Sequence, residues 1–182
     1  MNSLLGILIA ALPFLPLISN AQQKPEESIL LAPDDWRSER IEFPLSFAPD
    51  LPLKGYEDVR FAPGWGEPDN EEFWTYAFVW VLEEDISFEQ EDLETYLEAY
   101  YDGLMKVVAD LDDTGSKVSL KKITNGFEGL VTTIDGFFTK GTIHLNISVQ
   151  QDTNHWLFKL SPQPIEHPVW AGLQAITIAE SP

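Results

Sequence analysis

The stretch EFWTYAFVWVLE, from Glu72 to Glu83, is the strongest β-strand signal in the chain. Its even-numbered positions from 74 to 82 are all bulky, and most of its odd-numbered positions are apolar as well. A strand that is apolar on both faces is typical of the interior of a sheet. We therefore expect this stretch to form a central strand and its bulky face to receive a helix.

A long amphipathic helix is predicted directly after this strand, over about residues 87–111. Ser87 and Gln90 fit a capping box, and acidic residues fill the first two turns, where the helix dipole favours them. Apolar residues recur at steps of three and four: Leu93, Tyr96, Leu97, Tyr100, Leu104, Val107, Val108 and Leu111. The members expected to be buried are Leu97, Tyr100, Leu104 and Val108.

From Lys117 onward the pattern has a period of two, which predicts four antiparallel strands. Pairing Gln150 with His155 in the last hairpin puts Leu145, Ile147 and Val149 on an apolar face. Pairing Phe138 with Gly141 adds Ile134 and Leu130 to that face. A turn at Asn125-Gly126 would put Lys121 beside Leu130 on the buried face, so a bulge or a one-residue slip is expected there.

The opposite face of the last hairpin is polar. It carries His144, Asn146 and Ser148, which either meet water or line a concave ligand surface. Pro168 to Ala179 is predicted as a short C-terminal helix. The fold class is therefore α+β: an antiparallel sheet with the long helix and the short C-terminal helix packed on one face.

The first 21 residues contain no charged side chain. An apolar run interrupted by two prolines ends in Ser19-Asn20-Ala21, which fits a cleaved signal peptide over 1–21. Residues 22–33 are interpreted as an N-terminal tether and residues 34–182 as a single domain, with Asp34 to Arg40 as a candidate helical turn. We expect a secreted or periplasmic protein with no membrane insertion after signal cleavage.

Composition excludes several classes of function. The formal net charge is −19, and a protein this acidic repels phosphate backbones, so nucleic acid is not an expected partner. The chain has no cysteine, which excludes disulfides, thiol catalysis and zinc–thiolate sites. The absence of cysteine also favours a bacterial envelope or secreted protein, and it rules out lipid attachment at a mature N-terminal Cys.

No catalytic or metal motif is complete. His144 is six strand positions from the residue paired with His155, about 20 Å, so they share no metal. Asp110 to Gly115 imitates a calcium loop, but Lys121 stands where the bidentate Glu belongs. We also find no G-x-S-x-G, P-loop or G-x-G-x-x-G setting. No catalytic residue, cofactor or metal site is therefore assigned.

The candidate ligand-binding residues are three tryptophans outside the predicted strands, together with one histidine: Trp36, Trp65, Trp170 and His144. Tryptophan near polar groups stacks on sugars and other flat ligands. The alternative is that each tryptophan closes one end of the core.

The chain resembles a group of exported bacterial proteins of unknown function. The resemblance rests on Phe47-Ala48-Pro49, Phe61 to Gly64, Tyr76 to Trp80, Tyr100 to Leu104, and Ser161 to Pro164 with Trp170 downstream. It implies no activity or site residue. More loosely, a strand and a helix ending near Ile176 are similar to the PsbP/Mog1-like α+β sandwiches, which is an analogy of fold alone.

These observations favour a non-enzymatic, soluble secreted or cell-envelope protein that binds a protein or small-molecule partner. The alternative is a small carboxylate-dependent hydrolase acting on carbohydrate. A cleft with two carboxylates about 5–10 Å apart, flanked by exposed Trp, would favour the hydrolase. A filled core without such a cleft would favour the binding protein.

Overall fold

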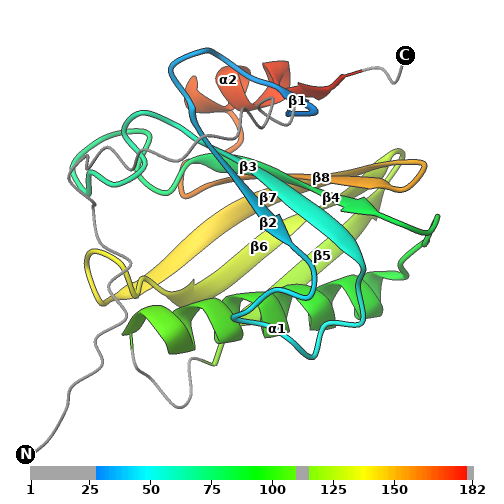
Figure 1. Ribbon diagram of the computed structural model, residues 1–182. Helices are drawn as coiled ribbons and strands as arrows, with labels where there is room; N and C mark the ends of the chain where they lie inside the picture. Colours follow the sequence, from blue (N-terminus) through cyan, green and yellow to red (C-terminus); the bar gives the residue numbers. More distant parts are fainter. Residues whose placement is uncertain (1–27, 110–114, 180–182) are drawn as a thin grey trace, which may run out of the picture.

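The computed structural model describes residues 28–109 and 115–179. These residues form a seven-stranded antiparallel sheet in the order β2-β3-β4-β8-β7-β6-β5 and a separate two-stranded sheet, β1-β9. Figure 1 shows helix α1 across one face of the large sheet, and α2 with β1 on the other face. The elements are β1 (Leu30–Leu31), β2 (Arg37–Glu42), β3 (Gly55–Phe61), β4 (Tyr76–Leu82), α1 (Gln90–Ala109), β5 (Lys117–Ile123), β6 (Gly126–Ile134), β7 (Thr142–Asp152), β8 (His155–Ser161), α2 (Val169–Ala175) and β9 (Thr177–Ile178).

The α+β class and the central position of β4 are confirmed, but the helices do not share a face. Phe78 and Trp80 of β4 belong to the core under α1. Ala77 and Val79 belong to a second core, with Leu173 of α2. Because β4 is apolar on both faces, each face requires its own cover. Placing both helices on one face was therefore wrong.

Helix α1 begins at Gln90 rather than Ser87, and the Gln90 side chain donates to Glu94 instead of capping. The predicted end at Leu111 lies outside the described residues. Leu97 and Tyr100 are buried as expected, but Leu104 and Val108 are only half-buried. The members buried in their place are Tyr101 and Met105. The helix also lies close to the backbone carbonyl of Phe47 at Gly103.

The last hairpin has a different register from the prediction. Val149 pairs with Phe158, and Asp152 with His155, so the turn is only Thr153-Asn154. Thr153 has a φ of +53°, which suits a tight hairpin. The displacement is two residues, an even number, so the predicted faces of both strands are preserved.

The β6–β7 register was also wrong, and here the displacement is odd. Val131 pairs with Leu145, so Val131 is buried while Leu130 and Ile134 point to the other face. The cause is a longer connection, in which Asp135 accepts hydrogen bonds from three backbone N–H groups of residues 137–139. Neither the bulge nor the one-residue slip expected between β5 and β6 occurs, since Lys121 pairs with Glu128 in an unbroken ladder, two residues from the expected Leu130.

The N-terminal segment from Ser28 is part of the fold. Leu30 is buried, and β1 pairs with β9. Residues 28–33 therefore pack on the domain instead of forming a tether, while residues 1–27, with the predicted signal peptide, lie outside the described part. The helical turn expected at 34–40 is a single turn followed by β2, and the C-terminal helix is shorter than 168–179 because β9 follows it.

Candidate functional site

An open groove lies on the face of the sheet that carries α2. It has a volume of about 840 Å³ and is open on one side. The strands β6 to β8 form its floor, and α2 with β9 forms one wall. Its lining is half apolar and half polar: Ile123, Asn125, Glu128, Ser148, Gln150, Gln151, Asp152, Leu157, Lys159, Ile165, Trp170, Gln174, Ile176, Thr177 and Ile178.

Strand alternation explains the polar floor of the groove. Lys159 of β8 pairs with Ser148 of β7, and Ser148 pairs in turn with Glu128 of β6. Residues that are directly opposite on antiparallel strands project from the same face, so these three side chains form one row across the sheet. The neighbours of Lys159 along the strand, Phe158 and Leu160, project into the core under α1. The groove floor is thus the polar face that the sequence predicted.

Lys159 is the unusual member of this row, because only 5% of its surface is exposed. Its ammonium donates to the backbone carbonyl of Gln174 at 3.3 Å, where α2 approaches the sheet. In the described part of the chain, the Lys159 ammonium lies in no ion pair. Burial lowers the pKa of Lys159, since it removes water from the charged form.

A second buried polar cluster lies on the opposite face, beneath α1. Glu57 of β3 is fully buried and accepts hydrogen bonds from Trp80 Nε1 at 2.8 Å and Tyr100 OH at 3.1 Å. Burial raises the pKa of Glu57 to about 7, although the two hydrogen bonds act in the other direction. Tyr76 and Tyr101 share a further hydrogen bond nearby. The lining of the groove contains none of these residues, so we assign the cluster to the core.

The structure does not bring the predicted site residues together. Trp170 lines the groove from α2, but it is buried and donates to the carbonyl of Gln163 at 2.8 Å. Trp36 packs half-buried on the core under α2. Trp65 lies in an aromatic cluster with Phe61, Trp74, Phe137 and Phe138.

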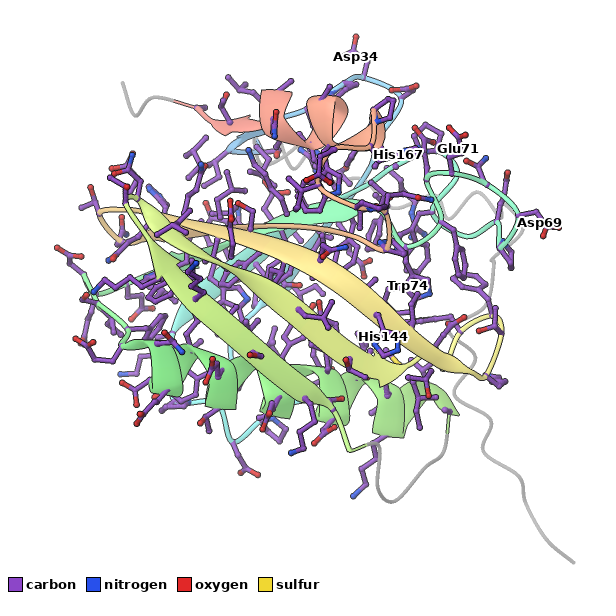
Figure 2. The ribbon with its side chains drawn as sticks, turned by 180° about the vertical axis from the view of Figure 1, so that it is seen from behind. Asp34, Asp69, Glu71, Trp74, His144 and His167 are labelled. Carbon is purple, nitrogen blue, oxygen red and sulfur yellow. The ribbon has the colours of Figure 1, made fainter. Side chains whose placement is uncertain are left out.

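His144 is exposed on the outer side of β7, as Figure 2 shows, and bonds to Thr132. It stands four residues from Ser148, about 13 Å along the strand, and does not line the groove. His155 pairs with Asp152, farther from His144 than the sequence indicated. Within residues 28–109 and 115–179, no three His, Asp or Glu side chains are grouped closely enough to hold a metal ion.

Two carboxylates, Glu128 and Asp152, line the groove and are both exposed. Glu128 is opposite Ser148, and Asp152 is four residues farther along β7. This register separates the two side chains by about 13 Å, beyond the distance of about 5–10 Å at which paired carboxylates hydrolyse glycosides. The groove therefore does not provide the pair that the hydrolase alternative requires.

Alternation places Lys159 on the polar face, but the pattern did not indicate Lys159 or its acceptor on α2 as site residues. A signal for the lysine was present, because it is the only charged residue between the apolar positions 156 and 160 of strand HWLFKLS. No signal indicated Gln174, since the contact depends on where α2 crosses β8. The groove needs both of these elements.

Comparison with known protein families, with curated proteins and with solved structures gives no match for this chain. The resemblances to exported bacterial proteins and to the PsbP/Mog1-like sandwiches therefore stay predictions. None of the helices that the described residues form is long and apolar enough to span a membrane. The assignment of a site rests on the groove alone.

Proposed function

We propose that this chain is a non-enzymatic, exported binding protein that holds a small amphipathic ligand in the groove between β6–β8 and α2. The observation that carries the proposal is the groove itself. Its volume of about 840 Å³ lies in the range typical of small-molecule sites. Apolar side chains such as Leu157 and Ile176 lie beside polar ones such as Ser148 and Gln150, a combination that suits a ligand with an apolar body and a polar end.

The proposal is tested by mapping where small molecules bind. We expect fragments detected by NMR to shift the backbone signals of Ser148, Gln150, Lys159 and Gln174. Gln150→Trp should abolish these shifts by filling the groove from an exposed position. His144→Trp is the matched control, because His144 is exposed on the same face of β7 but outside the groove. Fragments that map only to other surfaces, or that bind Gln150→Trp unchanged, would contradict the proposal.

Export is the second part of the proposal and is supported by the uncharged N-terminal run that ends at Ala21. We expect cleavage between Ala21 and Gln22. N-terminal sequencing of the protein recovered from the envelope or medium of an expressing bacterium checks it. An exported protein that still begins at Met1 would show that the segment is not a cleaved signal.

A further inference from the structure

We infer that the ligand of the groove is an organic anion, a carboxylate carried on an apolar body, and that the Lys159 ammonium is its counter-ion. This inference rests on the proposed function and names the class of ligand that the groove takes. It is carried by the position of one buried cation, by the groups beside it, and by the distribution of charge around it.

The first argument is the incomplete set of partners of Lys159. A lysine ammonium has three N–H donors, and the described residues accept one of them, through the Gln174 carbonyl at 3.3 Å. A buried charge is normally paired, because an unpaired one is costly. This chain has 30 acidic residues against 11 basic ones, so carboxylate partners are plentiful. The one buried lysine in the described part of the chain nevertheless contacts a carbonyl instead of a carboxylate.

The second argument is the position of Lys159 within the groove. Lys159 and Gln174 both line it, so the ammonium is at the junction of the floor and the α2 wall. Ser148 is directly opposite Lys159 on β7, and their Cβ atoms are about 5 Å apart. The Ser148 hydroxyl has no hydrogen-bond partner among residues 28–109 and 115–179. The Lys159 ammonium and the Ser148 hydroxyl are thus donors on paired residues of the groove lining, and one carboxylate can accept from both.

The third argument is the placement of the acidic residues. Glu128 is two strands from Lys159, about 10 Å, and Asp152 lies farther along β7 at the rim. Both are exposed, so water and salt weaken their repulsion of an anion. The wall beside Lys159 is apolar, with Leu157, Trp170 and Ile176. The groove thus offers one positive centre beside an apolar surface.

The experiment compares 4-phenylbutyrate with its neutral amide, 4-phenylbutyramide, by NMR titration of the full chain. We expect the carboxylate to bind about tenfold more tightly than the amide, the effect of one charge-assisted hydrogen bond. Lys159→Met should lower carboxylate affinity about tenfold and leave amide affinity unchanged. Lys159→Gln, a second neutral variant, should give the same loss. Lys121→Met is the matched control: it removes an exposed lysine from the same cross-strand row, and the preference should remain.

The possible outcomes separate the two proposals. Equal affinity for the two probes in the groove, or a preference that survives in Lys159→Met, overturns the anion and leaves the binding groove standing. If 4-phenylbutyrate does not bind up to about 10 mM while 4-phenylbutyramide shifts the groove signals, the anion is likewise overturned and the binding groove stands. Shifts that map outside the groove overturn the proposed function, and the anion with it.

Discussion

The side-chain carboxyl of Glu57 is buried away from water. Its raised pKa, about 7 against an ordinary value of 4.5, means that the folded chain keeps a proton that the unfolded chain releases. Between these two values the folded state binds more protons, so unfolding becomes easier as the pH rises. The contribution of this proton to stability is complete below about pH 4.5 and is lost as the pH rises through about 7.

Glu57→Gln should remove this dependence. The amide stays neutral and can still accept from Trp80 Nε1. The free energy of unfolding of the variant, relative to that of the natural chain, should rise by on the order of 3 kcal/mol from about pH 5 to about pH 8, at about 1.36 kcal/mol per pKa unit. Urea unfolding of both proteins at the two pH values measures the difference. An equal difference at both pH values would show that Glu57 does not titrate in this range.

Gly103 matters because α1 approaches another segment closely there. A Cβ at this position would lie 2.1 Å from the backbone oxygen of Phe47. Gly103→Ala should therefore lower the free energy of unfolding by about 1–3 kcal/mol, although alanine favours a helix more than glycine does. Gly172→Ala in α2 is the matched control, since outside the adjacent turns of its own helix nothing lies within 4 Å of its Cβ position. Gly172→Ala should stabilise the protein by up to about 1 kcal/mol. Thermal unfolding compares the two, and equal effects would contradict the close approach.

At the scale of elements, α1 completes the hydrogen bonding of an edge strand. β5 ends the large sheet. Glu94 accepts from the N–H of Leu120 at 2.6 Å, and Glu98 from that of Val118 at 3.1 Å. One turn farther along, Asp102 accepts from Ser116 at 2.8 Å. Four helical residues rise about 6 Å and two strand residues about 6.8 Å, so the two repeats match. The carboxylates occupy donors that would otherwise pair with another strand.

Removing two of these carboxylates should expose the edge. The double variant Glu94→Ala, Glu98→Ala should lose about 1–3 kcal/mol for each N–H left without an acceptor and should self-associate through β5. Sedimentation velocity at increasing protein concentration detects the association. The control is Glu91→Ala with Asp92→Ala, which removes the same charge from exposed positions of α1. A monomeric first variant, or a control that associates equally, would argue against edge protection.

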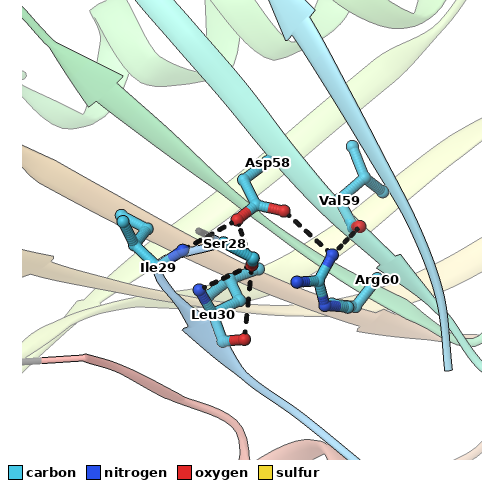
Figure 3. Close-up of polar contacts among 6 residues, drawn as sticks. All are labelled: Ser28, Ile29, Leu30, Asp58, Val59 and Arg60. Atoms are coloured by element: carbon cyan, nitrogen blue, oxygen red, sulfur yellow. Dashed lines mark hydrogen bonds and ion pairs between the residues drawn. The ribbon is translucent and has the colours of Figure 1, made fainter. Parts of the chain in front are cut away.

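At the scale of the whole molecule, the buried carboxylate of Asp58 joins the N-terminal segment to the sheet. Figure 3 shows Asp58 of β3 accepting from Ser28 Oγ and from the backbone N–H of Ile29. Its other oxygen accepts from Arg60 at 3.0 Å. The segment then continues into β1, which pairs with β9 beyond α2. Both ends of the described chain are thereby held on the face that carries the groove.

Asp58→Ala should destabilise the protein by about 3–5 kcal/mol, because it leaves the buried Arg60 unpaired. It should also speed amide hydrogen exchange at Leu30 and Thr177, since β1 loses its attachment. Glu42→Ala, which breaks an exposed pair with Arg40, is the control and should cost at most about 1 kcal/mol. Unchanged exchange in Asp58→Ala would mean that β1 is held by its apolar contacts alone.

Much of the element order could be predicted because it depends on local pattern. The two apolar faces of 72–83 indicated a central strand, and alternation after Lys117 indicated a meander with a polar face. The register of the strand pairs was harder to predict from the sequence. Alternation assigns a side chain to a face but leaves shifts of two residues open, as in β7–β8. In β6–β7 the Asp135 connection shifted the pairing by an odd number, and Leu130 moved to the outer face.

The sequence by itself determined the α+β class, the central strand, the long helix and the polar face of β7, because periodicity is a property of neighbouring residues. Only the tertiary structure decided that α1 and α2 cover opposite faces, that Ser28 to Leu31 belong to the domain, and that Lys159 meets Gln174 in a groove. These features join residues distant in the chain, and their positions depend on how whole elements pack. The candidate site is of this second kind: alternation indicated its polar floor, but the wall that α2 adds depends on tertiary packing.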